Sequence, residues 1–252
     1  MRRYLIPILS VVVFFSSCNE STKKVNQAKT YLILFDVSLS VAKPETRLSY
    51  RSAYQKIFTK IEAGDNILVG YITDKSINQL ELPVTFRFES FNAASDNDIT
   101  LMNEKSKYLS MINRQKDSVN RIIDSILTKV KRKVEYTDIF SSLNLAEKLF
   151  GQYSNTQKVL VIFSDMEEDN PEIQFDNTNL SESRVKEIIE KRRTDNLLPN
   201  LTGVKVFIVG ANSVDYKKYE QIETFWLKFL KECNADIKKS NYNSALANFE
   251  LY

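Results

Sequence analysis

Apolar runs of strand length alternate with helical patterns along most of the chain. Four runs are almost continuously apolar, as in strands that are buried on both faces: Thr30–Asp36, Asn66–Ile72, Lys158–Asp165 and Val204–Gly210. A further run, Leu80–Phe88, alternates more and contains Pro83, which favours an edge strand. The pattern predicts an α/β fold with a mostly parallel central sheet, one antiparallel edge strand and helices on both faces.

Between these runs, apolar residues recur at helical spacing. The spacing predicts a helix from Tyr50 to Ile61 with Gly64 as its C-terminal cap, and one long or two short helices over 101–132. Two more helices are expected, one beginning at Asp138 and one spanning Tyr219–Leu230. The long segment 166–202 is expected to hold a helix that starts near Asn179, with Glu182 three residues on, and Asn234–Ile237 to form a last short strand.

The first residues of the chain have the pattern of a targeting segment. Met1-Arg2-Arg3 is basic, and the apolar run Tyr4–Phe15, about a dozen residues, is too short to span a bilayer as a helix. The run ends in Ser16-Ser17-Cys18, which resembles the cleavage and acylation site of bacterial lipoproteins. We expect a signal peptide over 1–17, a tether over 18–29 that starts at lipidated Cys18, and one domain over 30–252. An ordinary secretory signal followed by a chance cysteine is the alternative.

Charge and cysteine content narrow the class of protein. The formal net charge is +3, and cleavage before Cys18 lowers the count of basic residues from 35 to 33 against 32 acidic ones. A nearly neutral chain gives no reason to expect a nucleic-acid partner. The one other cysteine, Cys233, cannot form an internal disulfide once Cys18 is lipidated. A location in the bacterial cell envelope, anchored to a membrane by the lipid, follows from this layout.

Oxygen-bearing residues follow the first predicted strand. The segment Asp36-Val37-Ser38-Leu39-Ser40 has a carboxylate and two hydroxyls at alternate positions, which point the same way in extended chain. Ligands of α/β sheets bind at the carboxyl ends of the strands, where these residues lie. Hard oxygen donors in a chain without histidine suit Mg²⁺, Mn²⁺ or Ca²⁺ and not a zinc site.

The pattern D-x-S-x-S after a buried strand and before a helix resembles the metal ion-dependent adhesion site of the von Willebrand factor A family. That family's site also uses a threonine from a distant loop and an aspartate after the fourth strand, and Thr137 and Asp165 match these two positions. The resemblance covers the chain from about Thr30 to the end and implies a Rossmann-like fold. It implies that Ser38 and Ser40 coordinate the metal directly and that Thr137 joins or leaves the metal ligands with the state of the domain. It also implies that Asp36 and Asp165 contact the metal largely through bound water.

The same resemblance implies a protein partner whose carboxylate completes the metal site, and no enzymatic activity. Two other functions stay open: a metal-dependent hydrolase or phosphatase with Asp36 as nucleophile, and a lipid-anchored solute-binding protein. Against the first stands Ser38, where such phosphatases have a second aspartate. The helical stretch 101–132 and the loop after Asp165 go beyond a minimal domain of the family.

Each candidate residue also has a purely structural interpretation. Asp36 is suited to capping a helix, Ser38 and Ser40 are common turn residues, and Thr137 is more often a cap than a ligand. The acidic cluster of Glu167, Glu168 and Asp169 is interpreted as a solvated turn, with a second cation as the alternative. The apolar stripe around Trp226 is interpreted as core.

Overall fold

A computed structural model describes residues 27–38, 41, 43–74, 81–94, 97–129, 136–213, 215–246 and 249–251. Their strands form one six-stranded sheet in the order β3-β2-β1-β4-β5-β6. The strands are β1 (Lys29–Asp36), β2 (Asn66–Ile72), β3 (Val84–Arg87), β4 (Gln157–Phe163), β5 (Val204–Val209) and β6 (Tyr242–Asn243). All neighbouring pairs are parallel except β2 with β3, which is antiparallel at the sheet's edge. The predicted fold class, a mostly parallel sheet with one antiparallel edge strand, is confirmed.

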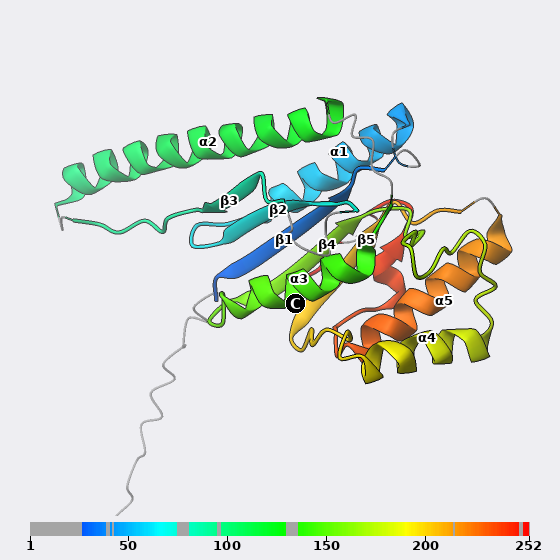
Figure 1. The fold of residues 1–252 in the computed structure, drawn as a ribbon. Coiled ribbons are helices and arrows are strands. Elements are labelled where there is room, and N and C mark those ends of the chain that lie inside the picture. Colours follow the sequence, from blue (N-terminus) through cyan, green and yellow to red (C-terminus); the bar gives the residue numbers. More distant parts are fainter. Residues whose placement is uncertain are drawn as a thin grey trace, which may run out of the picture.

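Helices cover both faces of the sheet (Figure 1). They are α1 (Pro44–Phe58), α2 (Asp98–Lys129), α3 (Ile139–Gly151), α4 (Glu182–Thr194) and α5 (Tyr216–Glu232). Alternate residues of β1 enter different cores: Tyr31, Ile33 and Phe35 pack with α1 and α2, whereas Leu32 and Leu34 pack with α3, α4 and α5. A strand that is apolar on both faces is stable only between two such layers. This explains why the strand sequences are continuously apolar.

Several predicted boundaries are wrong in detail. Helix α1 begins at Pro44 and ends at Phe58, so Gly64 does not cap it and instead adopts a φ of 91° in the turn before β2. Ser181, and not Asn179, caps α4 by accepting from the Arg184 N–H. Local side-chain competition decides such ends, because several nearby polar residues can each accept from the first turn of a helix.

The last strand also lies elsewhere than predicted. Only an isolated bridge between Lys205 and Asp236 forms in the segment predicted as a strand, and the sheet is extended by Tyr242 and Asn243 instead. The long pattern over 101–132 is a single helix, α2, as far as Lys129, beyond which residues 130–135 are outside the described part of the chain. Asp138 caps α3 through the Ser141 N–H, as its position in the sequence predicts.

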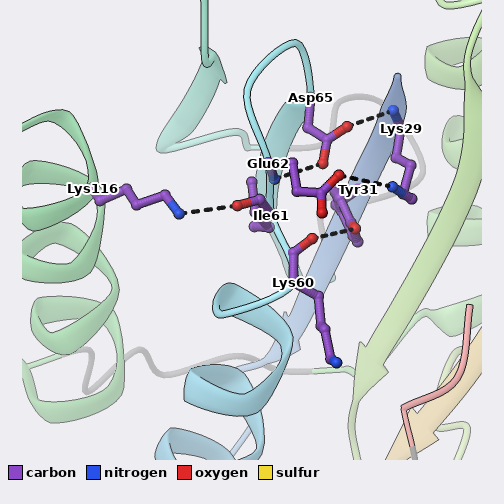
Figure 2. A network of polar contacts seen from close by, with 7 residues as sticks. All are labelled: Lys29, Tyr31, Lys60, Ile61, Glu62, Asp65 and Lys116. Atoms are coloured by element: carbon purple, nitrogen blue, oxygen red, sulfur yellow. Dashed lines mark hydrogen bonds and ion pairs between the residues drawn. The ribbon is translucent and has the colours of Figure 1, made fainter. Parts of the chain in front are cut away.

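At the amino end of β1, polar contacts of the buried Asp65 carboxylate and of Lys116 join three segments (Figure 2). The two oxygens of Asp65 accept from the main-chain N–H of Lys29 at 2.7 Å and of Glu62 at 2.9 Å. Lys116 of α2 donates to the carbonyl of Ile61 at 3.0 Å. The start of β1, the turn before β2 and the long helix are therefore tied together at this end of the sheet.

The predictions for the first part of the chain remain predictions. Residues 1–26, with the expected signal peptide and Cys18, are outside the described part. In the described part, none of the helices combines the length and the apolar character that a membrane span requires. Cys233 is free and fully buried in the core between α5 and the sheet.

Candidate metal site

The register of the two central strands places Asp36 beside the end of β4. Because Phe35 of β1 pairs with Phe163 of β4, the next residues, Asp36 and Ser164, are neighbours at the carboxyl edge of the sheet. The Ser164 hydroxyl donates to Asp36 Oδ2 at 2.8 Å. The ends of β1 and β4 therefore lie side by side, and Asp165 is the residue that follows Ser164.

Ser38 hydrogen-bonds to the Asp36 carboxylate oxygen that Ser164 leaves free. Its main-chain N–H donates to Asp36 Oδ1 at 2.8 Å, and its hydroxyl also bonds to this carboxylate. Both side chains are buried, and they line a cavity of about 30 Å³ that continues toward Arg47 and Tyr50. Ser40, the third residue of the predicted pattern, is outside the described part of the chain.

The Asp36 carboxylate is in an unfavourable electrostatic position. Burial raises its pKa above the ordinary value, and the hydrogen bonds from Ser38 and Ser164 offset this only in part. These donors are neutral, so they stabilise the negative charge less than a cation does. A divalent cation at this point would provide the compensation.

The Tyr50 hydroxyl lies within the electrostatic range of both Asp36 and Asp165. Its pKa is raised well above the usual value, mainly by burial and then by the charges of Asp36 and of Asp165. Asp165 directly follows Ser164, which bonds to Asp36, so both carboxylates belong to the same edge of the sheet. Repulsion between them favours a bound cation at this end of the sheet.

The turn after β4 is held in an unusual conformation. Met166 has a φ of 68°, which is rare for a residue with a side chain. Its N–H donates to Ser164 Oγ at 2.9 Å, and its carbonyl accepts from Trp226 Nε1 at 2.8 Å. Trp226 is fully buried, as expected for a core residue. These contacts determine where Asp165 stands relative to Asp36.

Thr137 is fixed to the loop that follows Asp165. It forms a pair of main-chain hydrogen bonds with Asp169, of 2.8 and 3.0 Å, directly before α3. The Thr137 side chain is buried, and no hydrogen bond joins it to Asp36 within the described part of the chain. The structure thus connects Thr137 to the Asp165 loop but not directly to the Asp36 carboxylate.

The expectation of a solvated acidic turn is wrong for Glu168. This side chain is fully buried, and its carboxylate accepts from the N–H groups of Ile139 and Phe140 at the start of α3 and from the Asn170 amide. A carboxylate is favoured there because unpaired N–H groups and the helix dipole both attract negative charge. Glu168 therefore stabilises the start of α3, and with it the position of Thr137.

Sequence reasoning missed Ser164 and Tyr50 as neighbours of the site. Ser164 had a recognisable signal, since it is a polar residue inside the otherwise apolar run before Asp165. Tyr50 had none, because it occupies an ordinary core position of the α1 pattern. Its approach to the site depends on how α1 crosses the sheet.

The donors present suit a hard cation that is bound by carboxylates and hydroxyls together. No cluster of three or more Asp, Glu, His or Cys side chains able to hold a metal exists in the described residues, so acidic groups alone do not form a site there. Aspartate, serine and threonine oxygens suit Mg²⁺, Mn²⁺ or Ca²⁺. The chemistry of the group around Asp36 therefore fits such an ion, provided that hydroxyls contribute.

No protein-family model matches this chain, and no curated protein does. Solved structures are similar to it at low identity. Proximal thread matrix protein 1 from the mussel byssus, with a zinc-occupied MIDAS motif, has 13% identity and a TM-score of 0.42, over 78% of this chain and 41% of that one. An aerotolerance-related membrane protein from Bacteroides fragilis has 15% identity and a TM-score of 0.42, over 82% of this chain and 89% of that one.

A von Willebrand factor type A structure from Catenulispora acidiphila is also similar, with 11% identity and a TM-score of 0.41, over 82% of this chain and 42% of that one. The family that the D-x-S-x-S pattern resembles is thus among the solved structures to which this chain is similar. The chain spans about two fifths of the mussel and Catenulispora proteins. Its function has to be inferred from its own residues.

Proposed function

We propose that this chain is a lipid-anchored protein of the bacterial cell envelope whose domain binds one divalent cation, Mg²⁺ or else Mn²⁺ or Ca²⁺, and uses it to hold a protein partner. One observation carries the proposal. The carboxylate of Asp36 is buried at the carboxyl end of the central strand, between two serines and close to Asp165. A concentration of negative charge at that place is stabilised by a cation.

The roles of the residues in metal binding would be those that the resemblance to the von Willebrand factor A family implies. Ser38 and Ser40 supply hydroxyls to the metal, with Thr137 as a ligand that joins or leaves. Asp36 and Asp165 act largely through bound water, so the ion keeps much of its positive charge. A carboxylate from the partner then completes the coordination. The metal supplies an electrophilic bridge between the two proteins.

Binding is favoured over catalysis by the state of Asp36. A nucleophilic carboxylate needs an accessible oxygen, whereas both oxygens of Asp36 accept hydrogen bonds, one from Ser38 and one from Ser164. The adjoining cavity, about 30 Å³, has room for water or an ion and not for a solute molecule. The geometry therefore supports metal-mediated contact with a surface.

Strand β1 separates the metal site from the point at which the chain enters the domain. The described chain enters the domain through Lys29, and Asp36 ends the same strand seven residues later. At about 3.3 Å per residue, the two ends of β1 lie about 23 Å apart. If lipidated Cys18 holds the chain at a membrane, the metal site lies at the end of β1 opposite to the tether.

Calorimetric titration with Mg²⁺ and Mn²⁺ tests the metal site. We expect wild type to bind one ion and Asp36→Ala to lose at least about 100-fold in affinity, since the charge that stabilises the ion is gone. Asp65→Asn is the matched control, because it alters a buried aspartate at the other end of the sheet and should bind like wild type. Absence of binding by wild type, or equal binding by Asp36→Ala, contradicts the proposal.

Two measurements test the anchor and the partner separately. Mass spectrometry of the mature protein from its native membrane should find a lipid on Cys18 as the first residue, and an unmodified Cys18 would rule the anchor out. A pull-down from the same membranes with and without a chelator tests the partner. Proteins that are retained only without the chelator, and not by Asp36→Ala, are the expected result. Identical captures in all samples would argue against metal-mediated binding.

A further inference from the structure

Tyr50 carries a hydroxyl that the fold buries without a hydrogen-bond partner. The side chain is 2% exposed, and its hydroxyl oxygen reaches no donor or acceptor in the described part of the chain. A buried polar group in this state costs about 1–3 kcal/mol in the folded protein. Such a cost calls for a functional or structural explanation.

The surrounding core prevents this hydroxyl from turning toward water. The Tyr50 ring lies against Phe35 and Phe163, with ring centroids 6.5 and 5.1 Å away, at the ends of β1 and β4. Its hydroxyl end rests on Gly210, where an added Cβ would lie only 2.4 Å from the oxygen. Glycine at position 210 therefore provides the room in which the hydroxyl stands.

The same tyrosine lines the small cavity at the metal site. This cavity, about 30 Å³, also touches the side chains of Asp36 and Ser38. A space of that size holds about one or two water molecules when polar groups surround it. Tyr50, Asp36 and Ser38 all line this cavity and carry polar groups of this kind. The cavity is therefore suited to a water that also belongs to the shell of a bound ion.

We propose that Tyr50 is a positioning residue of the metal site, whose hydroxyl donates a hydrogen bond to a water molecule held beside Asp36 when the cation is bound. The inference rests on the proposed function. Within the described part of the protein the hydroxyl has no partner, and the water that ion binding fixes beside Asp36 supplies one. Tyr50 thereby strengthens metal binding and lowers the stability of the metal-free fold.

Tyr54, one turn further along α1, provides a contrast within the same helix. It is equally buried, but its hydroxyl donates to Asn120 Oδ1 of α2 at 3.0 Å. Its hydrogen bond contributes to folding whether or not a metal is present. The two tyrosines are thus equally buried on one helix, and Tyr54 has a hydrogen-bond partner within the protein whereas Tyr50 has none in the described residues.

Phenylalanine substitutions separate the two roles. In Tyr50→Phe we expect the Mn²⁺ dissociation constant to rise about 3- to 10-fold, the usual value of one hydrogen bond. The metal-free variant should unfold at the wild-type temperature or about 2–4 °C above it, because an unpaired hydroxyl is removed. In Tyr54→Phe the expectations are reversed: unchanged Mn²⁺ affinity and a melting temperature lowered by about 2–4 °C.

The inference is overturned if Tyr50→Phe binds Mn²⁺ like wild type, or if its metal-free form is destabilised as much as Tyr54→Phe. These outcomes leave the proposed metal site intact, provided that wild type binds Mn²⁺. Failure of wild type to bind any divalent ion instead removes the proposed function, and the inference with it. Calorimetric titration with Mn²⁺, and thermal unfolding with and without Mn²⁺, of wild type, Tyr50→Phe and Tyr54→Phe distinguish the cases.

Discussion

The two ends of β1 each hold a buried aspartate, and the groups around the two carboxylates differ. Asp65, at the amino end, is 1% exposed, and each of its oxygens accepts a main-chain N–H, from Lys29 or from Glu62. Asp36, at the carboxyl end, is 4% exposed and is bonded in part through serine hydroxyls. Main-chain donors are fixed by the fold, whereas a hydroxyl can rotate and also act as a metal ligand.

The difference separates a carboxylate that holds the fold from one that is suited to binding. Asp65 connects two chain segments by accepting from their part-buried N–H groups, and Lys29 adds a nearby positive charge. Asp36 has neutral donors and a second carboxylate, Asp165, close by. Burial raises the pKa of both aspartates, so burial alone does not identify the functional one. The chemistry of the surrounding donors does.

The largest effect is expected for Asp65→Ala. Loss of the carboxylate removes two hydrogen bonds between a charged group and the part-buried N–H groups of Lys29 and Glu62, at about 1.5–3 kcal/mol each, so we expect the free energy of unfolding to fall by about 4 kcal/mol. Urea unfolding measures this, in the absence of metal. A loss below about 1 kcal/mol would show that Asp65 does not hold this end of the sheet together.

The pH dependence of stability should report the raised pKa of Asp65. Because the folded pKa lies above the unfolded value, the protonated form favours the fold: the stabilisation is complete below the unfolded pKa of 3.8 and is lost as pH rises through the folded pKa. The stability of wild type relative to Asp65→Asn should therefore fall with rising pH over that window, by at most about 1.4 kcal/mol per pH unit. Denaturant titrations at a series of pH values, without metal, measure the difference. A difference independent of pH contradicts the raised pKa.

Asp36→Ala should change the metal-free protein much less than Asp65→Ala does. Removing this carboxylate takes away three hydrogen bonds, two from Ser38 and one from Ser164, but also an unfavourably buried charge, so we expect a change in unfolding free energy of no more than about 1 kcal/mol. Unfolding in the presence of a chelator measures it. Equal destabilisation by the two alanine variants would erase the proposed distinction between the two ends of the sheet.

The smallest effect is expected for Lys116→Met at the amino end. The Lys116 ammonium donates to the Ile61 carbonyl and lies 5.8 Å from the ring centre of Phe58. Methionine keeps the apolar stem, so we expect a loss of about 0.5–1 kcal/mol and unchanged metal affinity. Urea unfolding and Mn²⁺ titration of one sample test both parts. Weakened metal binding here would mean that the two ends are coupled.

Much of the architecture is predictable because a strand that is buried on both faces has a continuously apolar sequence. The runs that became β1, β2, β4 and β5 are continuously apolar, and Pro83 marks the edge strand that follows it. Helix ends and β6 were harder, since Gly64, Asn179 and the segment 234–237 offered local signals that tertiary packing did not use. Alternative helix ends or strand positions a few residues apart differ too little in free energy to be distinguished from the local sequence.

Within the candidate site, the sequence by itself determined that Asp36 ends one apolar strand, that Asp165 follows another and that Ser38 follows the first of them. Tertiary structure alone decided that Ser164 bonds to Asp36, that Glu168 is buried at the start of α3, and that Tyr50 reaches the same cavity. The reason is physical: period and composition report which side of an element is apolar, whereas contacts between distant segments depend on strand register and on how helices cross the sheet.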